Sequence, residues 1–365
     1  MNKRQILAVL AGTLSLAVGI FAVWIFWFPM SISQGSPEQR QEQEPAPATS
    51  PETQYLANSG RRLTGPFTHK NLTFYLIHGK DNLTGKTPAT LEEAMESRVV
   101  TVRETGEVNE LSIENISRND EVFVQAGDIV KGGQQDRMLG VDLIIPAHSG
   151  RIPIDSFCVE SQRWTARGRE PRTEFNSSTE YAPSKDLKLA AKQDKSQSEV
   201  WKKVEDSQEK LSLATNSNAA SSVSRSSLPL TMQNRRVRED SANYARFMED
   251  IVPKKSDVIG IVMIINGKIN SADTYGSSEL FVKLWPKLLN AAAIEAVAES
   301  REDASQNAVT AADIESFFEA VENAPVTEER KVTDRIHMMT RDSKTSVFLE
   351  TRDRDTVLHR NYLMK

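Results

Sequence analysis

Apolar and polar residues alternate with a period of two through much of the first half of the chain. This pattern is typical of half-buried β-strands, and Gly, Asn or Asp residues separate the segments as they do at turns. Thr90 and Glu93 have the spacing of a capping box, which predicts one short helix among the strands. We predict a β-rich unit here, a small barrel or a sandwich. Its alternating strands are expected at residues 99–103, 108–113, 121–125, 138–145 and 152–160, and a short apolar run at 72–78 predicts a strand ahead of the helix.

A buried hairpin followed by helices is predicted for the second half. Residues 258–265 form a continuous apolar run, Asn266-Gly267 is a strong turn signal, and residues 268–273 form the returning strand. Apolar residues then recur at helical spacing over residues 280–292, behind Ser277 or Ser278 as N-cap, and Pro286 is expected to kink or break this helix. A second helix is expected at 311–321, and strands at 332–339, 346–351 and 357–363 complete the sheet. The pattern therefore predicts an α+β fold.

Between the two halves, residues 166–230 are rich in Ser, Lys, Gln and Asn. We interpret this segment as a loop-rich insertion. Val200, Trp201, Val204 and Leu211 recur at helical spacing and predict one amphipathic helix within it. A further helix is expected near residues 240–251.

The N-terminus carries the clearest compartment signal. Lys3 and Arg4 precede a run from Ile6 to Phe28 that contains no charged residue and is long enough to span a bilayer. We expect an uncleaved transmembrane anchor with residues 1–5 inside, although a cleaved signal peptide is the alternative. Residues 29–61 have little to bury and are predicted to be a disordered linker. Residues 62–365 would then form a globular domain outside the cytoplasm.

The charge balance argues against nucleic acid as a partner, and the cysteine content argues against disulfides. The chain has 45 basic and 50 acidic residues, a net charge of −5, and no dense basic block, which disfavours nucleic acid as a partner. Its single cysteine, Cys158, excludes an intrachain disulfide.

The segment QAGDIVKGGQQDRML, residues 125–139, concentrates charged side chains around two glycines. Paired glycines let consecutive N–H groups converge on an anion, to which cationic side chains would add charge-assisted donors. The alternative is a polar turn between two strands, with its charges paired on the surface. On the first interpretation, the ligand-binding residues are Lys131, Gly132, Gly133, Gln135 and Arg137.

A second polar cluster, FCVESQRW, covers residues 157–164. Glu160 and Arg163 would either contact a ligand, together with Trp164, or form a structural ion pair, whereas Cys158 is expected to be a buried structural residue. The candidates for acid–base catalysis are Asp128, Asp136 and Glu160, and the same carboxylates would hold a hard divalent cation. The five histidines have no zinc-site spacing.

Three stretches together resemble the ARG and Rhodanese-Phosphatase-superfamily-associated domain family over roughly residues 62–365. They are the glycine segment at 125–139, IPAHSGRIPIDSFCVESQRW at 145–164, and IGIVMIINGKINSADTYGSSELFVKLWPKLL at 259–289. The family is named for its association with ADP-ribosylglycohydrolases and rhodanese-like phosphatases. The resemblance therefore implies a link to ADP-ribose-like or other phosphorylated metabolites, without catalytic residues to carry over. After the Leu-Leu, where the family has Ser-Tyr, this chain has Asn290-Ala291.

Two functional hypotheses follow from the sequence. In the first, the exported domain binds a phosphorylated small molecule at the glycine segment. Whether it also hydrolyses the ligand is left open; if it does, the three candidate carboxylates would supply acid–base or metal-ligand groups. In the second, the domain is a non-catalytic module of the cell envelope that binds another protein. Convergence of the charged residues on one pocket would favour the first hypothesis, and dispersal over exposed turns would favour the second.

Overall fold

The computed structural model describes residues 51–56, 60–161, 163–301 and 308–365, which belong to one compact unit. Within these residues, none of the helices combines the length and apolar character needed to cross a membrane. The anchor predicted at residues 6–28 lies outside the described residues. The first strand lies at Glu52–Tyr55, inside the segment predicted to be a linker, so regular structure begins earlier than expected.

A nine-stranded antiparallel sheet contains the predicted hairpin. Asn266 and Gly267 both have positive φ, 52° and 67°, as a tight turn between twisted strands requires. The C-terminal strands complete this sheet, as predicted, and an additional edge strand, β15, joins them. In spatial order the strands are β1 (Glu52–Tyr55), β2 (Arg62–His69), β3 (Leu72–His78), β13 (Val258–Ile265), β14 (Lys268–Tyr275), β18 (Thr356–Met364), β17 (Ser346–Asp353), β16 (Ile336–Asp342) and β15 (Val326–Lys331).

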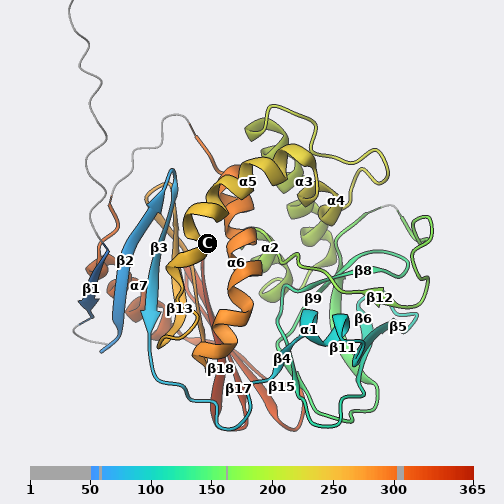
Figure 1. Ribbon diagram of the computed structural model, residues 1–365, viewed down its shortest axis with the longest axis horizontal. Helices are drawn as coiled ribbons and strands as arrows, with labels where there is room; N and C mark the ends of the chain where they lie inside the picture. Colours follow the sequence, from blue (N-terminus) through green and yellow to red (C-terminus); the bar gives the residue numbers. More distant parts are fainter. Residues whose placement is uncertain (1–50, 57–59, 162, 302–307) are drawn as a thin grey trace, which may run out of the picture. The chain divides into compact units, whose positions relative to one another are not determined.

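Each face of this sheet is covered by a helix. Alternate residues of β13 point to opposite faces. Ile261 and Met263 pack in the core that includes α6 (Ser278–Ala298), which lies alongside β13 in Figure 1, whereas Val262 packs with α7 (Ala311–Glu322). The prediction of a local break at Pro286 is wrong, because α6 continues through that residue.

The β-rich unit in the first half is a nearly closed six-stranded sheet with a three-stranded sheet beside it. The two edge strands of the larger sheet approach each other where Arg103 forms a backbone β-bridge with Glu174, next to β12. This contact gives the unit a barrel-like form. The strand predicted at 138–145 is two strands, β9 and β10, which belong to different sheets. The six-stranded order is β12 (Phe175–Asn176), β8 (Ile129–Gly132), β9 (Arg137–Leu139), β11 (Ile152–Cys158), β6 (Glu110–Asn115), β5 (Val100–Glu104); the other is β10 (Leu143–Ile145), β7 (Val122–Val124), β4 (Ala89–Thr90).

The segment predicted to be a loop-rich insertion is more helical than expected. Val200, Val204 and Leu211 line the buried face of α3, as their spacing predicted, whereas Trp201, predicted with them, is exposed. The helices α2 and α4 are additional. Residues 215–227, between α3 and α4, form turns without a helix or strand. The predicted capping box of Thr90 and Glu93 begins α1. The remaining helices are α1 (Leu91–Glu96), α2 (Lys185–Lys192), α3 (Gln197–Ala214), α4 (Leu228–Met232), α5 (Arg235–Met248) and the 3₁₀ helix η1 (Glu249–Ile251).

Candidate functional site

The two glycines predicted to hold an anion do adopt positive φ, but their N–H groups already have partners within the protein. The Gly132 N–H donates to Asp136 Oδ1 at 3.0 Å, and the Gly133 N–H donates to the Glu174 carbonyl at 3.2 Å. A Cβ at Gly133 would lie 2.4 Å from the Phe175 ring, so a side chain at this turn would also be obstructed. The anion at this turn is therefore the chain's own carboxylate.

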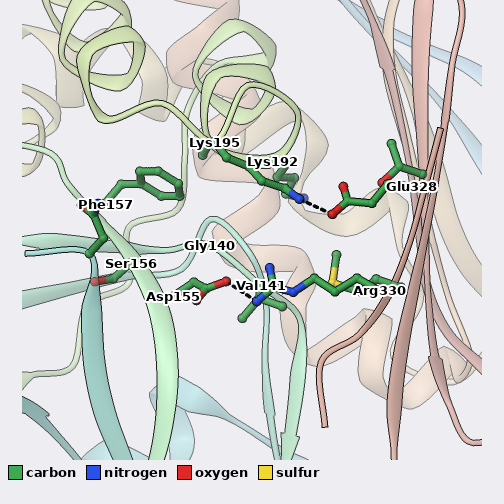
Figure 2. Close-up of a pocket in the computed structure, with 13 residues that line it drawn as sticks. Gly140, Val141, Asp155, Ser156, Phe157, Lys192, Lys195, Glu328 and Arg330 are labelled. Carbon is green, nitrogen blue, oxygen red and sulfur yellow. Dashed lines mark hydrogen bonds and ion pairs between the residues drawn. The ribbon is translucent and has the colours of Figure 1, made fainter. Parts of the chain in front are cut away.

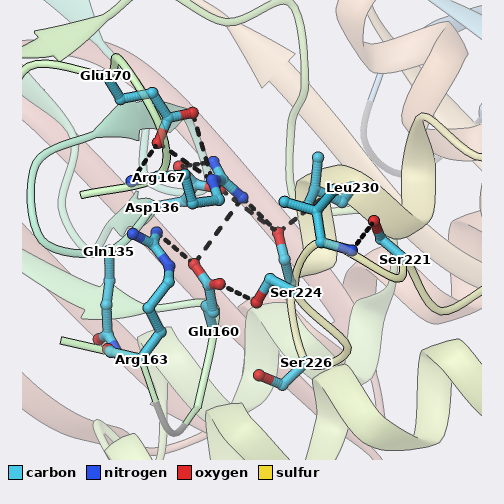
Figure 3. Close-up of polar contacts among 12 residues, drawn as sticks. Gln135, Asp136, Glu160, Arg163, Arg167, Glu170, Ser221, Ser224, Ser226 and Leu230 are labelled. Atoms are coloured by element: carbon cyan, nitrogen blue, oxygen red, sulfur yellow. Dashed lines mark hydrogen bonds and ion pairs between the residues drawn. The ribbon is translucent and has the colours of Figure 1, made fainter. Parts of the chain in front are cut away.

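Asp136 and Glu160 lie in one buried network of arginine–carboxylate pairs (Figure 3). Both oxygens of Asp136 accept hydrogen bonds of 2.7 Å from Arg167, and Glu160 pairs with Arg163 at 2.5 Å. Burial raises the pKa of the Asp136 carboxyl, although Arg167 opposes this change. Ser224 also donates to Glu160. The network thus fastens two segments of the insertion to the β-rich unit.

Arg137 and Cys158 are internal residues of the β-rich unit. The guanidinium of Arg137 has no exposed surface and contacts Glu104 at 3.3 Å, Cys158 Sγ at 2.9 Å and the ring of Trp164, whose centroid is 5.4 Å away. Burial raises the pKa of the Cys158 thiol, although Arg137 opposes this change. These contacts agree with a structural cysteine, and they leave Arg137 pointing inward.

The three carboxylates predicted to share catalytic or metal-binding work do not form one group. Asp128 lies apart from the arginine network and pairs with Lys287. Across the described ranges, no three His, Cys, Asp or Glu side chains are grouped as metal ligands would be. Gln135 contacts the arginine network through its hydrogen bond to the Arg163 carbonyl. The structure thus separates the predicted residues: Asp136 and Glu160 lie in the network, Arg137 lies inside the β-rich unit, and Lys131 lines a separate cleft.

That cleft has a volume of about 470 Å³ and is the strongest candidate site. Three cationic residues line it: Lys131 from β8, Arg238 from α5 and Lys287 from α6. The uncharged lining includes Asn290, which stands where the sequence departs from the family motif. Lys131 was predicted from the sequence, whereas Arg238 and Lys287 were not. Only the fold brings these distant residues together.

Acidic side chains hold two of the three cations in place. Lys131 pairs with Glu180 at 2.9 Å, and Glu180 also accepts a 2.6 Å hydrogen bond from Gln233. Lys287 is only 7% exposed and pairs with Asp128, which in turn accepts from the Gln125 N–H at 3.0 Å. A buried lysine with a fixed carboxylate partner is oriented before any ligand arrives.

The first turn of α5 adds positive potential at the edge of the cleft. This turn contains Arg235, Arg236 and Arg238 but no acidic residue, although Glu239 just after it pairs with Arg235 at 3.4 Å and with Arg236 at 3.6 Å. The N-terminus of a helix already carries a partial positive charge, so cations there are unfavourable unless an anion is present. Burial raises the pKa of Glu92, which also lines the cleft, although Lys287 opposes this change. Three cations and two carboxyls, Glu92 and Glu180, therefore line the cleft, and Arg238 is the one of these cations that forms no ion pair within the described residues.

A second buried network was not predicted from the sequence. His359 on β18 lies between Asp142, 2.8 Å from Nδ1, and Asp273, 3.0 Å from Nε2, and the ring of Tyr275 stacks on it at 4.6 Å. Lys192 reaches the same network through Asn361 at 3.1 Å. The sequence signal that could have indicated this network was the presence of polar residues, such as Asp273 and His359, within predicted strands. All of these residues are buried, so the network joins elements rather than facing a ligand.

The fold is a mixed α+β domain, and its surface carries a polar cleft lined by three cations. The chain belongs to the family described as the ARG and Rhodanese-Phosphatase-superfamily-associated Protein domain, whose model matches residues 61–363. The resemblance inferred from three sequence motifs is therefore confirmed. Comparison with curated proteins and with solved structures gives no match. The family assignment covers both the nine-stranded sheet, except β1, and the β-rich unit.

Proposed function

We propose that the cleft lined by Lys131, Arg238 and Lys287 binds a phosphorylated small molecule. The observation that carries this proposal is the convergence of three cationic side chains from distant segments on one cleft. Phosphate oxygens accept strong, charge-assisted hydrogen bonds from such groups. Gln233 and Asn290 supply amide groups that would contact the rest of the ligand. The volume of about 470 Å³ lies within the range of small-molecule sites.

The proposed site differs from the one inferred from the glycine segment. Of those residues, only Lys131 lines the cleft. Its partner Glu180 would remain beside the bound anion and limit the net attraction, so we expect binding that is micromolar rather than nanomolar, about −8 kcal/mol. ADP-ribose-like molecules, which the family resemblance implies, are the first ligands to test.

A thermal-shift screen of the full chain in detergent, with ADP-ribose, nucleotides and sugar phosphates, tests the proposal. A ligand at a hundred times its dissociation constant should stabilise the protein by about 2.7 kcal/mol. Lys131→Ala and Arg238→Ala should each remove most of this shift because each deletes a phosphate donor. Arg246→Ala is the matched control, since Arg246 is an exposed arginine on the same helix, and it should leave the shift intact.

The absence of a shift with every ligand, in protein that is folded by circular dichroism, would contradict the proposal. The alternative hypothesis of a protein-interaction module would then be favoured. Loss of the shift in Arg246→Ala to the same degree would also contradict it, because the effect would then follow surface charge in general.

Hydrolysis of the bound ligand is a second candidate function, favoured by Glu92. This carboxyl lines the cleft, and burial raises its pKa, which a general acid at neutral pH requires. The carboxylates predicted from the sequence are less suited, because Asp136 and Glu160 are enclosed by arginines and Asp128 is held by Lys287. Chromatography of the ligands after incubation with the protein distinguishes binding from turnover, because every hydrolysis product differs from its parent whether or not free phosphate is released.

We further propose that residues 6–28 anchor the protein in a membrane, with the domain on the extracytoplasmic side. The support is the uncharged run from Ile6 to Phe28 behind Lys3 and Arg4. A reporter enzyme that is active only outside the cytoplasm, fused after Lys365, should be active. The same fusion without residues 1–28 should be inactive. Activity of a cytoplasmic reporter at Lys365 would contradict this topology.

A further inference from the structure

A second cavity, of about 160 Å³, lies where β11, the end of α2 and the strands β15 and β16 meet (Figure 2). It shares no lining residue with the cleft described above. Val141, Phe157 and Met338 give it an apolar surface. Four charged side chains on its rim form two ion pairs, each between one cation and one carboxylate. The cavity is therefore an independent candidate site.

Two ion pairs connect the walls of this cavity, and strand β15 supplies the cation of one pair and the carboxylate of the other. Arg330 on β15 pairs with Asp155 on β11 at 2.7 Å, and Lys195 beyond α2 pairs with Glu328 on β15 at 2.5 Å. Figure 2 shows both pairs reaching across the hollow. All four side chains are between 39% and 47% exposed, so water screens both pairs and little stability is lost when they separate.

We propose that this cavity binds a free amino acid with a medium-sized apolar side chain. The ligand's carboxylate would pair with Arg330 and Lys195, and its ammonium group would pair with Asp155 and Glu328. Each charge released from the existing ion pairs would thereby gain a new partner of opposite sign. The planar guanidinium of Arg330 suits a carboxylate because it presents two parallel donors.

The balance of charges selects for a zwitterion. Apart from Lys192, whose ammonium group is bonded to Asn361, two cations and two carboxylates line the cavity. An acid or an amine would pair with one set of these side chains and would be repelled by the other set.

The apolar surface and the volume set the size of the side chain. Phe157 and Val141 are 7% and 2% exposed, and Met338 lies opposite on β16. A cavity of about 150 Å³ lined by apolar residues accommodates a molecule the size of benzene. The volume of about 160 Å³ covers the whole cavity, including the space beside the charged side chains, so it limits the complete ligand to an amino acid about the size of leucine or methionine. Lys192 also lines the cavity, but its ammonium group is bonded to Asn361 in the buried network.

Isothermal titration calorimetry on the full chain in detergent tests the proposal with L-leucine and L-methionine. Two analogues that each lack one charge, 4-methylpentanoate and 3-methylbutylamine, should bind about two- to fivefold more weakly than L-leucine, since a charge pair with side chains this exposed is screened by water. Arg330→Gln and Glu328→Gln should each weaken the binding of L-leucine by a similar factor.

Matched controls come from the same strand. Glu329→Gln and Lys331→Gln alter exposed charges of β15 that do not line the cavity, and they should leave L-leucine binding unchanged. Failure of both amino acids to bind the unmodified protein would overturn the proposal. So would equal binding in Arg330→Gln and Glu328→Gln, or binding of either analogue as tightly as L-leucine. None of these outcomes bears on the phosphate proposal, because the two sites have no residue in common.

Discussion

Replacing Arg167 with leucine should lower the free energy of unfolding by about 3 to 5 kcal/mol, the usual cost of removing one partner from a buried ion pair. Arg167 is the residue that neutralises Asp136, which has no exposed surface, and it also lies 3.9 Å from Glu160. Its loss would leave Asp136 with only the Gly132 N–H and a weak contact to Ser227. Urea denaturation followed by circular dichroism measures the change.

Arg169→Leu is the control for Arg167→Leu. Arg169 is exposed and only two residues away, so the same substitution there should change the free energy of unfolding by less than about 0.5 kcal/mol. A loss below about 1 kcal/mol for Arg167→Leu would show that Asp136 finds another partner or becomes protonated. Such a result would contradict the view that this network fastens the insertion to the β-rich unit.

Replacing His359 with leucine should produce a loss of similar size, also about 3 to 5 kcal/mol, because Asp142 and Asp273 would remain buried without their shared partner. The ring stacking with Tyr275 would be lost as well. His337→Leu is the control, since His337 is an exposed histidine in the same sheet. Equal effects of the two substitutions in urea denaturation would contradict a special role for His359.

The same network makes stability depend on pH in a predictable direction. Burial opposes protonation of His359, but Asp142 and Asp273 outweigh it and raise the pKa above its ordinary value of 6.5. The stabilisation from protonated His359 is therefore complete below pH 6.5 and is lost as the pH rises through the folded-state pKa. The loss approaches about 1.4 kcal/mol per pH unit in that interval.

The two aspartates have the opposite dependence. Burial by itself would raise the pKa of Asp142 and of Asp273, but His359 and Lys192 hold both below the ordinary value of 3.8. Their contribution is present above pH 3.8 and is lost as the pH falls through their folded-state pKa values. Urea denaturation at a series of pH values should show that His359→Leu removes the decline on the alkaline side. An unchanged slope in this variant would assign the decline to other groups.

Local patterns predicted those features whose cause is local. Asn266-Gly267 formed the expected turn because both residues tolerate positive φ, and Thr90 with Glu93 formed a capping box because the partners lie within one turn of helix. The amphipathic helix around Val200 followed from spacing alone. Sequence reasoning failed at residues 138–145, because one apolar segment contributes strands to two different sheets, and at Pro286, because helix α6 is stabilised by packing on both sides of the proline.

The candidate site could be predicted only in part. Lys131 was identified from the glycine segment and lines the cleft, but Arg137 from the same segment points inward. Arg238 and Lys287 lie more than a hundred residues from Lys131 in the sequence, so no local pattern connects them with it. No local pattern connects Arg167 with Asp136 either, because their pairing requires the insertion to fold back onto the residue just before β9.

By itself, the sequence determined the α+β class, most of the elements, the family and the uncharged N-terminal run, because each of these depends on residues that are neighbours in the chain or on ordered motifs. The tertiary structure alone decided which charges meet. It placed Asp136 against Arg167 rather than a ligand, and it gathered Lys131, Arg238 and Lys287 around one cleft. The physical reason is that electrostatic interactions depend on distance and burial in space, and neither can be calculated from positions along the chain.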